Sequence, residues 1–197
     1  MIFGGIRELV VVGVLALQGD FAKHLEALVR CGCKARAVRT PAELRECERF
    51  VIPGGESTTL GILLRKAGLD VVLRERISGG MPVWGTCMGM ILLAKEIEGS
   101  DQFRLGVLDV SVSRNAFGSQ VHSFETDLWV KGFERPFHAV FIRAPVVTRV
   151  GEGVEVLATY EDKVVAVRQG RLLATAFHPE LTDDLRFHQM FIEMDGV

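Results

Sequence analysis

Residues 81–94 read MPVWGTCMGMILLA, and this stretch predicts the fold around it. An apolar run, a turn centred on Cys87 and a second apolar run are typical of a buried strand that turns sharply into a helix. Gly85 and Gly89 flank Cys87 where strand and helix approach too closely for a Cβ. Such a turn is a nucleophile elbow, in which a helix beginning near Met88 directs backbone N–H groups at the sulfur and favours the thiolate. For an isolated G-x-C-x-G pattern, a cysteine that merely fills the core is an equal alternative.

Strand and helix patterns alternate on the N-terminal side of this turn. Residues 9–17 (LVVVGVLAL) form a nearly continuous apolar run, as expected for a strand buried on both faces. Asp20 is a plausible N-cap for the next helix, whose expected apolar stripe is Phe21, Leu25, Leu28 and Val29. The further expected elements are helices at residues 21–30, 41–47 and 60–66 and strands at residues 34–38, 50–52 and 82–84.

The C-terminal half is rich in strand patterns. We expect strands at residues 107–112, 124–130, 138–142, 154–160, 163–168 and 172–177, and a closing helix at residues 183–192. Alternating strands and helices followed by strands predict an α/β fold, with a mostly parallel central sheet flanked by helices and additional antiparallel strands. No linker divides the 197 residues, so we expect one domain over 1–197. In such sheets ligands bind beyond the carboxyl ends of the strands.

Composition excludes several classes of partner. The formal net charge is −2 and no run of Lys or Arg occurs, so we expect no nucleic-acid partner. Residues 9–17 are too few to span a bilayer, and residues 1–8 lack the features of a signal peptide, so we expect no membrane association.

The cysteine spacing also limits the chemistry. The four cysteines form no C-x-x-C pair, and the Cys31-Gly32-Cys33 motif has no second pair to complete a metal site. We therefore expect no metal and a reducing, cytoplasmic compartment. We also expect no cofactor.

A second motif offers Cys87 a base. His178-Pro179-Glu180 follows the strand expected at residues 172–177, and Pro179 biases His178 towards an extended conformation. Residues i and i+2 of an extended chain project to the same side, so Glu180 can orient His178. Together with Cys87 these side chains form a nucleophile, a general base and its orienting acid.

A glycine-rich turn, residues 53–59 (PGGESTT), follows the strand expected at residues 50–52. Its bare backbone N–H groups could stabilise an oxyanion. Two alternatives are an anion site, although the turn lacks the lysine of a Walker A motif, and a tight turn capped by Ser57 or Thr58.

The remaining polar candidates are arginines and histidines. Arg114 and Arg143 could each fork onto a substrate carboxylate, although such arginines are more often solvated. The other histidines have no partner that the sequence identifies: His24, His122, His138 and His188.

Six motifs in chain order carry a resemblance to a known family: LALQGD (15–20), PGGESTT (53–59), GTCMG (85–89), RNAFG (114–118), FIRAP (141–145) and HPELT (178–182). Together they resemble the glutaminase subunits of pyridoxal 5′-phosphate synthase, a branch of the class I (triad) glutamine amidotransferases. The elbow and HPE are shared across that superfamily, whereas the combination of LALQGD, PGGESTT, RNAFG and IRAP is much more specific to the vitamin B6 branch. The resemblance implies a three-layer, flavodoxin-like fold.

The resemblance implies that L-glutamine is hydrolysed to L-glutamate and ammonia through a thioester on Cys87. His178 would act as base and acid, oriented by Glu180. Gly55 and Met88 would supply backbone donors to the oxyanion. The implied glutamine-binding residues are Gly55, Glu56, Ser57, Arg114, Ile142 and Arg143.

The resemblance also implies a partner, a separate (β/α)₈-barrel synthase subunit that receives the ammonia within a large hetero-oligomer. The turn at residues 18–20 would contribute to the contact. Ser119 and His122 replace the Arg and Asp expected in the RNAFG loop. Two alternatives stay open: a glutaminase serving imidazole glycerol phosphate synthase, and a flavodoxin-like protein with a redox-sensing cysteine.

Overall fold

The computed structural model describes residues 9–114, 117 and 123–194. Its strands are β1 (Val11–Leu15), β2 (Lys34–Val38), β3 (Arg49–Ile52), β4 (Val83–Thr86), β5 (Ala94–Ile97), β6 (Leu108–Ser113), β7 (Ser123–Leu128), β8 (Phe137–Ile142), β9 (Val146–Val150), β10 (Glu155–Tyr160), β11 (Lys163–Gln169) and β12 (Leu172–Thr175). Its helices are α1 (Phe21–Arg30), α2 (Pro41–Arg45), α3 (Ser57–Lys66), α4 (Leu69–Ser78), α5 (Met88–Leu93) and α6 (Arg186–Ile192), with a 3₁₀ turn η1 (Pro179–Leu181).

One large sheet organises the molecule. Its strand order is β2-β1-β3-β4-β12-β11-β9-β6-β5, with β10 paired to β11. The first five of these strands are mutually parallel, and β11 continues the sheet antiparallel to β12. Strands β7 and β8 form a separate antiparallel ribbon. The expected fold, a mostly parallel sheet flanked by helices with added antiparallel strands, is confirmed.

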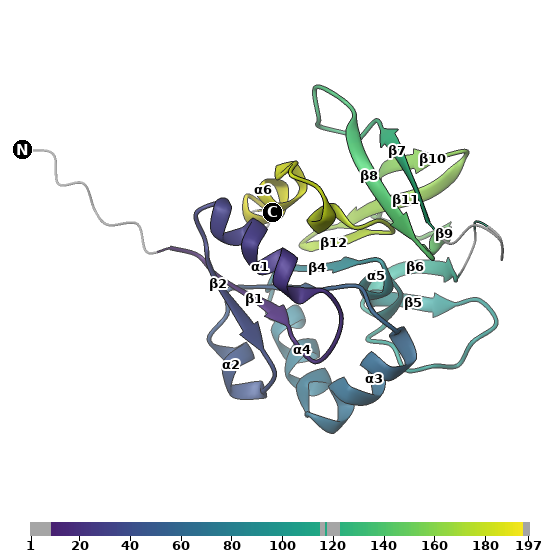
Figure 1. Ribbon diagram of the computed structural model, residues 1–197. Helices are drawn as coiled ribbons and strands as arrows, with labels where there is room; N and C mark the ends of the chain where they lie inside the picture. The colour runs from purple at the N-terminus through teal and green to yellow at the C-terminus, as the bar shows by residue number, and fades with distance from the viewer. Residues whose placement is uncertain (1–8, 115–116, 118–122, 195–197) are drawn as a thin grey trace, which may run out of the picture.

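Helices cover both faces of the parallel half (Figure 1). Helices α1 and α6 lie on one face, and α2, α3 and α4 lie on the other. Strand residues such as Val14, Phe50 and Trp84 are fully buried between the layers. Burial on both faces explains why these strands read as continuous apolar runs.

The carboxyl ends of β1, β3, β4 and β12 meet at one edge, since register pairs them side by side in parallel. The turns that follow these four strands therefore converge there, and they carry the motifs of residues 18–20, 53–59, 85–89 and 178–182. No helix in the part of the chain that the structure describes is long and apolar enough to cross a membrane.

Several elements differ from the sequence-based expectations. Helix α4 and strands β5 and β9 are additional, and α3 begins at Ser57 rather than at residue 60. Asp20 occupies the N-cap of α1 but its side chain makes no capping hydrogen bond. Val29, the last residue of the expected apolar stripe of α1, does not face the core, since it is 60% exposed.

Candidate active site

Cys87 occupies a strained turn between β4 and α5. Its backbone lies at φ 49° and ψ −109°, a conformation that L residues rarely adopt. A Cβ on Gly85 would lie 2.5 Å from the backbone of Gly89, and a Cβ on Gly89 would lie 2.1 Å from the carbonyl oxygen of Ile52. Both flanking glycines are therefore required sterically, as the sequence predicted. The Cys87 backbone N–H donates to Thr175 O at 2.7 Å, which ties the elbow to β12.

His178 and Glu180 lie beside this elbow. His178 Nδ1 is 2.7 Å from Glu180 Oε1, and the Glu180 side chain is 1% exposed. The contact forms differently from the expectation, because residues 179–181 make a 3₁₀ turn rather than extended chain. His178 is held from a second side, since its backbone N–H donates to Val140 O of β8 at 2.9 Å.

The other imidazole nitrogen faces the thiol side of the site. His178 Nε2 has no hydrogen-bond partner among the described residues. The Cys87 thiol donates instead to the carbonyl oxygen of Ile142 at 3.6 Å. Burial opposes protonation of His178, but Cys87 and Glu180 outweigh it and raise the His178 pKa well above the usual imidazole range. The ring is thus suited to accept the proton of the Cys87 thiol.

Gly54 makes room for this imidazole. A Cβ on Gly54 would lie 2.6 Å from His178 Cε1 and 3.3 Å from Cys87 Cβ. The first glycine of the Gly-Gly pair therefore has a packing role that the sequence did not indicate.

A hollow of about 420 Å³ opens above the thiol. Its lining brings together residues from five separate segments of the chain. They are Gly55, Glu56, Ser57, Cys87, Met88, Arg114, Ile142, Arg143 and His178. Of the site residues predicted from the sequence, Glu180 alone lies outside this lining, behind His178.

Glu56 has a structural role within this lining. It is the N-cap of α3, and its carboxylate accepts from the backbone N–H groups of Thr58 and Thr59 at 3.1 and 2.7 Å. The alternative in which Ser57 or Thr58 caps the helix is therefore wrong. Hydrogen bonds from Thr59 and Thr58 lower the pKa of Glu56 to about 2.

Gln102 joins two sides of the hollow, and no sequence motif pointed to it. Its Nε2 donates to Ser57 Oγ at 2.9 Å, and its Oε1 accepts from Arg114 Nη1 at 2.9 Å. Arg143 lies at the mouth with φ 46°, a left-handed conformation that turns the chain over the site after β8.

Three histidines that the sequence left without partners have them. His24 Nε2 lies 3.2 Å from Glu180 Oε2, and His24 Nδ1 lies 3.1 Å from His188 Nε2. His138 contacts Glu125 and Asp127 at 3.0 Å each, on the exposed ribbon. A signal for His24 existed, because it is three and four residues from the buried Ala27 and Leu28 of α1.

Some predictions lie outside the described residues. These concern residues 1–8, residues 115, 116 and 118 of the RNAFG motif, Ser119 and His122. Within the described ranges, no group of three or more His, Cys, Asp or Glu side chains could hold a metal ion.

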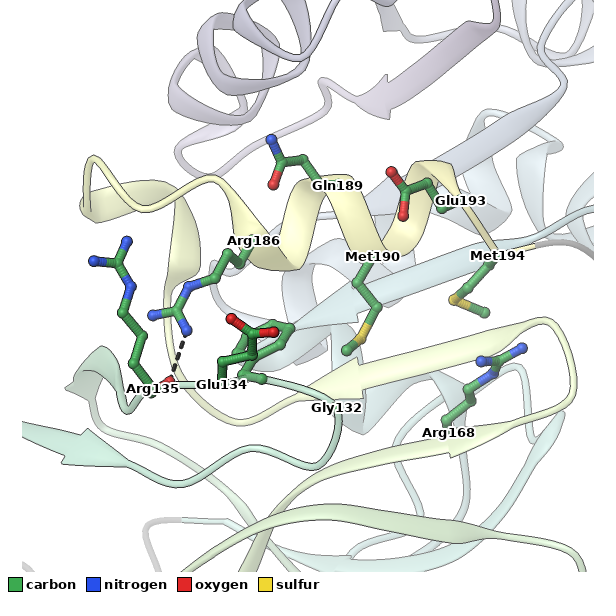
Figure 2. A pocket seen from close by; sticks show the side chains of 10 residues that line it. Gly132, Glu134, Arg135, Arg168, Arg186, Gln189, Met190, Glu193 and Met194 are labelled. Atoms are coloured by element: carbon green, nitrogen blue, oxygen red, sulfur yellow. Dashed lines mark hydrogen bonds between the residues drawn. The ribbon is translucent and has the colours of Figure 1, made fainter.

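A larger hollow of about 710 Å³ lies elsewhere, between α6 and the turn that precedes β8 (Figure 2). Arg186 in its lining is already engaged, since it donates to the carbonyl oxygens of Arg135 and Pro136 at 2.7 and 2.8 Å and pairs with Asp184. Cys87, His178 and Glu180 do not line it. Size therefore does not identify the reactive site in this molecule.

Comparison with known proteins identifies relatives over nearly the whole chain. The model of the SNO glutamine amidotransferase family matches residues 14–195. Pyridoxal 5′-phosphate synthase subunit PdxT of Pelotomaculum thermopropionicum is 57% identical over 92% of this chain and 93% of its own length. The protein of the same name from Thermus thermophilus is 57% identical over 95% and 98%.

Solved structures agree with these matches. A crystal structure of a glutamine amidotransferase is 56% identical, with a TM-score of 0.89 over 93% of this chain and 97% of that one. PurLQS from Thermotoga maritima is 14% identical with a TM-score of 0.69, a likeness of fold alone.

Proposed function

The chain belongs to the SNO glutamine amidotransferase family, and from this premise we propose that Cys87, His178 and Glu180 form its catalytic triad. Its activity is the hydrolysis of L-glutamine, and the ammonia released supplies the synthesis of pyridoxal 5′-phosphate, vitamin B6. The single observation that carries the proposed triad is the convergence of the Cys87 thiol and the His178–Glu180 pair beneath one hollow.

In the first half of the reaction the Cys87 sulfur attacks the side-chain amide carbon of glutamine. Its proton passes to His178 Nε2, the imidazole nitrogen that Glu180 leaves free. Collapse of the tetrahedral intermediate breaks the C–N bond, and His178 returns the proton to the departing nitrogen as ammonia forms. Because the resting thiol donates to Ile142 O, this hydrogen bond must break before the proton reaches His178.

In the second half water hydrolyses the glutamyl thioester. His178 takes a proton from the attacking water and returns it to the leaving sulfur, which releases L-glutamate and restores the thiol. Backbone N–H groups of Gly55 and Met88, both in the lining of the hollow, would stabilise the oxyanion in each half.

We propose that the rest of the lining binds glutamine. Arg114 and Arg143 supply positive charge for the α-carboxylate, and Ile142 and Ser57 complete the walls. Because the Glu56 carboxylate caps α3, we propose that Glu56 contributes to glutamine binding through its backbone and by shaping the loop.

The substrate is glutamine and the partner is a synthase. We propose that this partner is a (β/α)₈-barrel subunit in a large hetero-oligomer and that residues 18–20 contribute to the contact. The identity of 57% to synthase subunits of the vitamin B6 branch favours this partner over imidazole glycerol phosphate synthase.

We also propose that residues 1–197 form a single domain working in the reducing cytoplasm. The family model spans residues 14–195, and all four cysteines are free thiols.

Glutamate release in the presence of the synthase subunit tests the triad. Cys87→Ala should abolish release, whereas Cys47→Ala should retain it, because Cys47 is a buried thiol whose Sγ donates to Glu43 O, away from the hollow. A Cys87→Ala variant that still releases glutamate would refute the assignment.

Labelling with a diazo-ketone analogue of glutamine separates the triad from a redox sensor. Covalent modification of Cys87 supports the hydrolase, whereas oxidation of Cys87 without such labelling supports the sensor.

A further inference from the structure

A buried histidine extends the triad beyond Glu180. Glu180 Oε1 contacts His178, and Glu180 Oε2 lies 3.2 Å from Nε2 of His24 on α1. We propose that His24 is a positioning residue for the glutaminase reaction, which holds the Glu180 carboxylate in the orientation that His178 requires. This inference rests on the proposed triad.

Burial makes the second contact of Glu180 important. The Glu180 side chain is 1% exposed and the His24 side chain is 0% exposed. Glu180 Oε2 has no hydrogen-bond partner among the described residues, so its 3.2 Å ion-pair contact with His24 is what offsets the cost of its burial. Burial would raise the pKa of Glu180, but His24 and His178 outweigh it and hold that pKa well below its usual range.

One proton position along this chain follows from its partners. Ionised Glu180 only accepts, so its contact with His24 requires a proton on His24 Nε2. His188 Nε2 lies 3.1 Å from His24 Nδ1, and whichever of these two nitrogens carries a proton donates to the other. His188 Nδ1 is buried without a partner among the described residues.

His188 is suited to staying neutral in either arrangement. Burial, the charge that His24 would carry and the nearby Arg30 lower its pKa to about 3, against the opposing effect of Glu180. These are the ionisable groups that act on the His24–His188 pair, from η1, α1 and α6. Strand β4 contributes only neutral side chains, Trp84 and Thr86.

His24 also contacts the strand that carries the nucleophile. Its Nε2 lies 3.2 Å from Oγ1 of Thr86, the residue before Cys87. The edge of its ring packs against Trp84, with centroids 5.4 Å apart and planes at 80°. One imidazole therefore links the turn bearing Glu180 to the strand bearing Cys87.

Two amide substitutions separate positioning from simple core packing. The His24→Gln side chain can place an N–H where Nε2 lies, whereas the shorter His24→Asn reaches only the Nδ1 position. The measurements are kcat and KM of glutamate release with the synthase subunit, and the rate of Cys87 alkylation against pH in the chain alone.

We expect His24→Asn to lower kcat at least tenfold with little change in KM. A Glu180 carboxylate released from His24 turns away from His178 or takes up a proton, and either change weakens the imidazolium that stabilises the thiolate. The acid limb of the alkylation profile should therefore move up by about one pH unit, the size of one lost charge-assisted hydrogen bond. His24→Gln should recover most of both losses.

Trp84→Phe is the matched control. Trp84 packs on the rings of His24 and His188 but has its own hydrogen bond to Thr175 Oγ1, at 3.2 Å. It should lower the melting temperature and leave the acid limb in place.

Two results would overturn the proposal. In the first, His24→Asn and His24→Gln have the same kcat and the same position of the acid limb of the alkylation profile. In the second, Trp84→Phe shifts that acid limb by as many pH units as His24→Asn does. If Cys87→Ala is inactive while the His24 series is unaffected, positioning by His24 fails and the triad stands. An active Cys87→Ala would remove the triad itself.

Discussion

Gly54→Ala should disable the triad without disturbing the fold. The φ of Gly54 is not positive, so alanine fits its backbone and the effect arises from the added methyl group alone. That methyl would lie 2.6 Å from His178 Cε1, about 0.8 Å closer than the 3.4 Å at which ordinary contact begins. Either the imidazole or the loop must move by nearly 1 Å.

Neither side can move freely. His178 is held by Glu180 Oε1 at 2.7 Å and by Val140 O at 2.9 Å. The loop is held because Gly19 packs against Gly54 so closely that a Cβ on Gly19 would lie 1.9 Å from Gly54 O. A misplacement of this size costs on the order of 100-fold in rate, or about 2.7 kcal/mol of transition-state stabilisation.

The assay is steady-state glutamate release with the synthase subunit, alongside thermal unfolding. We expect kcat to fall roughly 100-fold, with KM nearly unchanged because the methyl group points at the imidazole. Gly79→Ala is the matched control, since Gly79 has φ −77° and its added Cβ would meet nothing closer than 3.5 Å. A stable Gly54→Ala protein with wild-type kcat would refute the reasoning.

Three further predictions concern stability. Glu56→Ala should lower the free energy of unfolding by about 1 kcal/mol through loss of the α3 cap. In the wild type this contribution should fade as pH falls from 4.5 towards 2, because the folded-state pKa of Glu56 is lowered to about 2. Urea titrations of both proteins at several pH values measure the difference, and a pH-independent difference would contradict the capping role. Gly89→Ala should cost about 3 kcal/mol or more, because its Cβ would lie 2.1 Å from Ile52 O; an unchanged melting temperature would show that α5 can shift. His188, with a folded pKa of about 3 against 6.5 unfolded, should make the protein lose stability as pH falls below 6.5; His188→Gln should flatten that slope in thermal melts, and an unchanged slope would assign it elsewhere.

Local patterns predicted the elements that position the chemistry. The glycines around Cys87, the proline beside His178 and the buried parallel strands each impose a constraint that few residue types satisfy. Their convergence followed from sheet topology, because successive parallel strands bring their carboxyl ends to one edge.

The elements that were missed lack such constraints. Helix α4 (LDVVLRERIS) buries little beyond Leu69, Val72 and Leu73, so its periodicity is weak. Strand β5 continues directly from the apolar run of α5, and no local signal separates the two. Strand β9 follows Pro145 and is stabilised by pairing with β6 and β11, a contact that spacing along the chain cannot reveal.

Long-range polar contacts could not be predicted from local sequence patterns for the same reason. His24 and Glu180 are 156 positions apart in the chain, and the capping by Glu56 competes with two adjacent residues that favour the same position. Only the packed structure decides between such partners.

The Cys87 sulfur is sheltered, with 2% of the residue exposed and its thiol donating to Ile142 O. Small thiol reagents should therefore reach the Cys87 sulfur more readily than bulky ones. Of the four free cysteines, Cys31 alone is not buried, so a bulky maleimide applied to the native protein should count one rapid thiol. A small haloacetamide should modify Cys87 more slowly, and the ratio of the two rates measures how accessible the Cys87 thiol is.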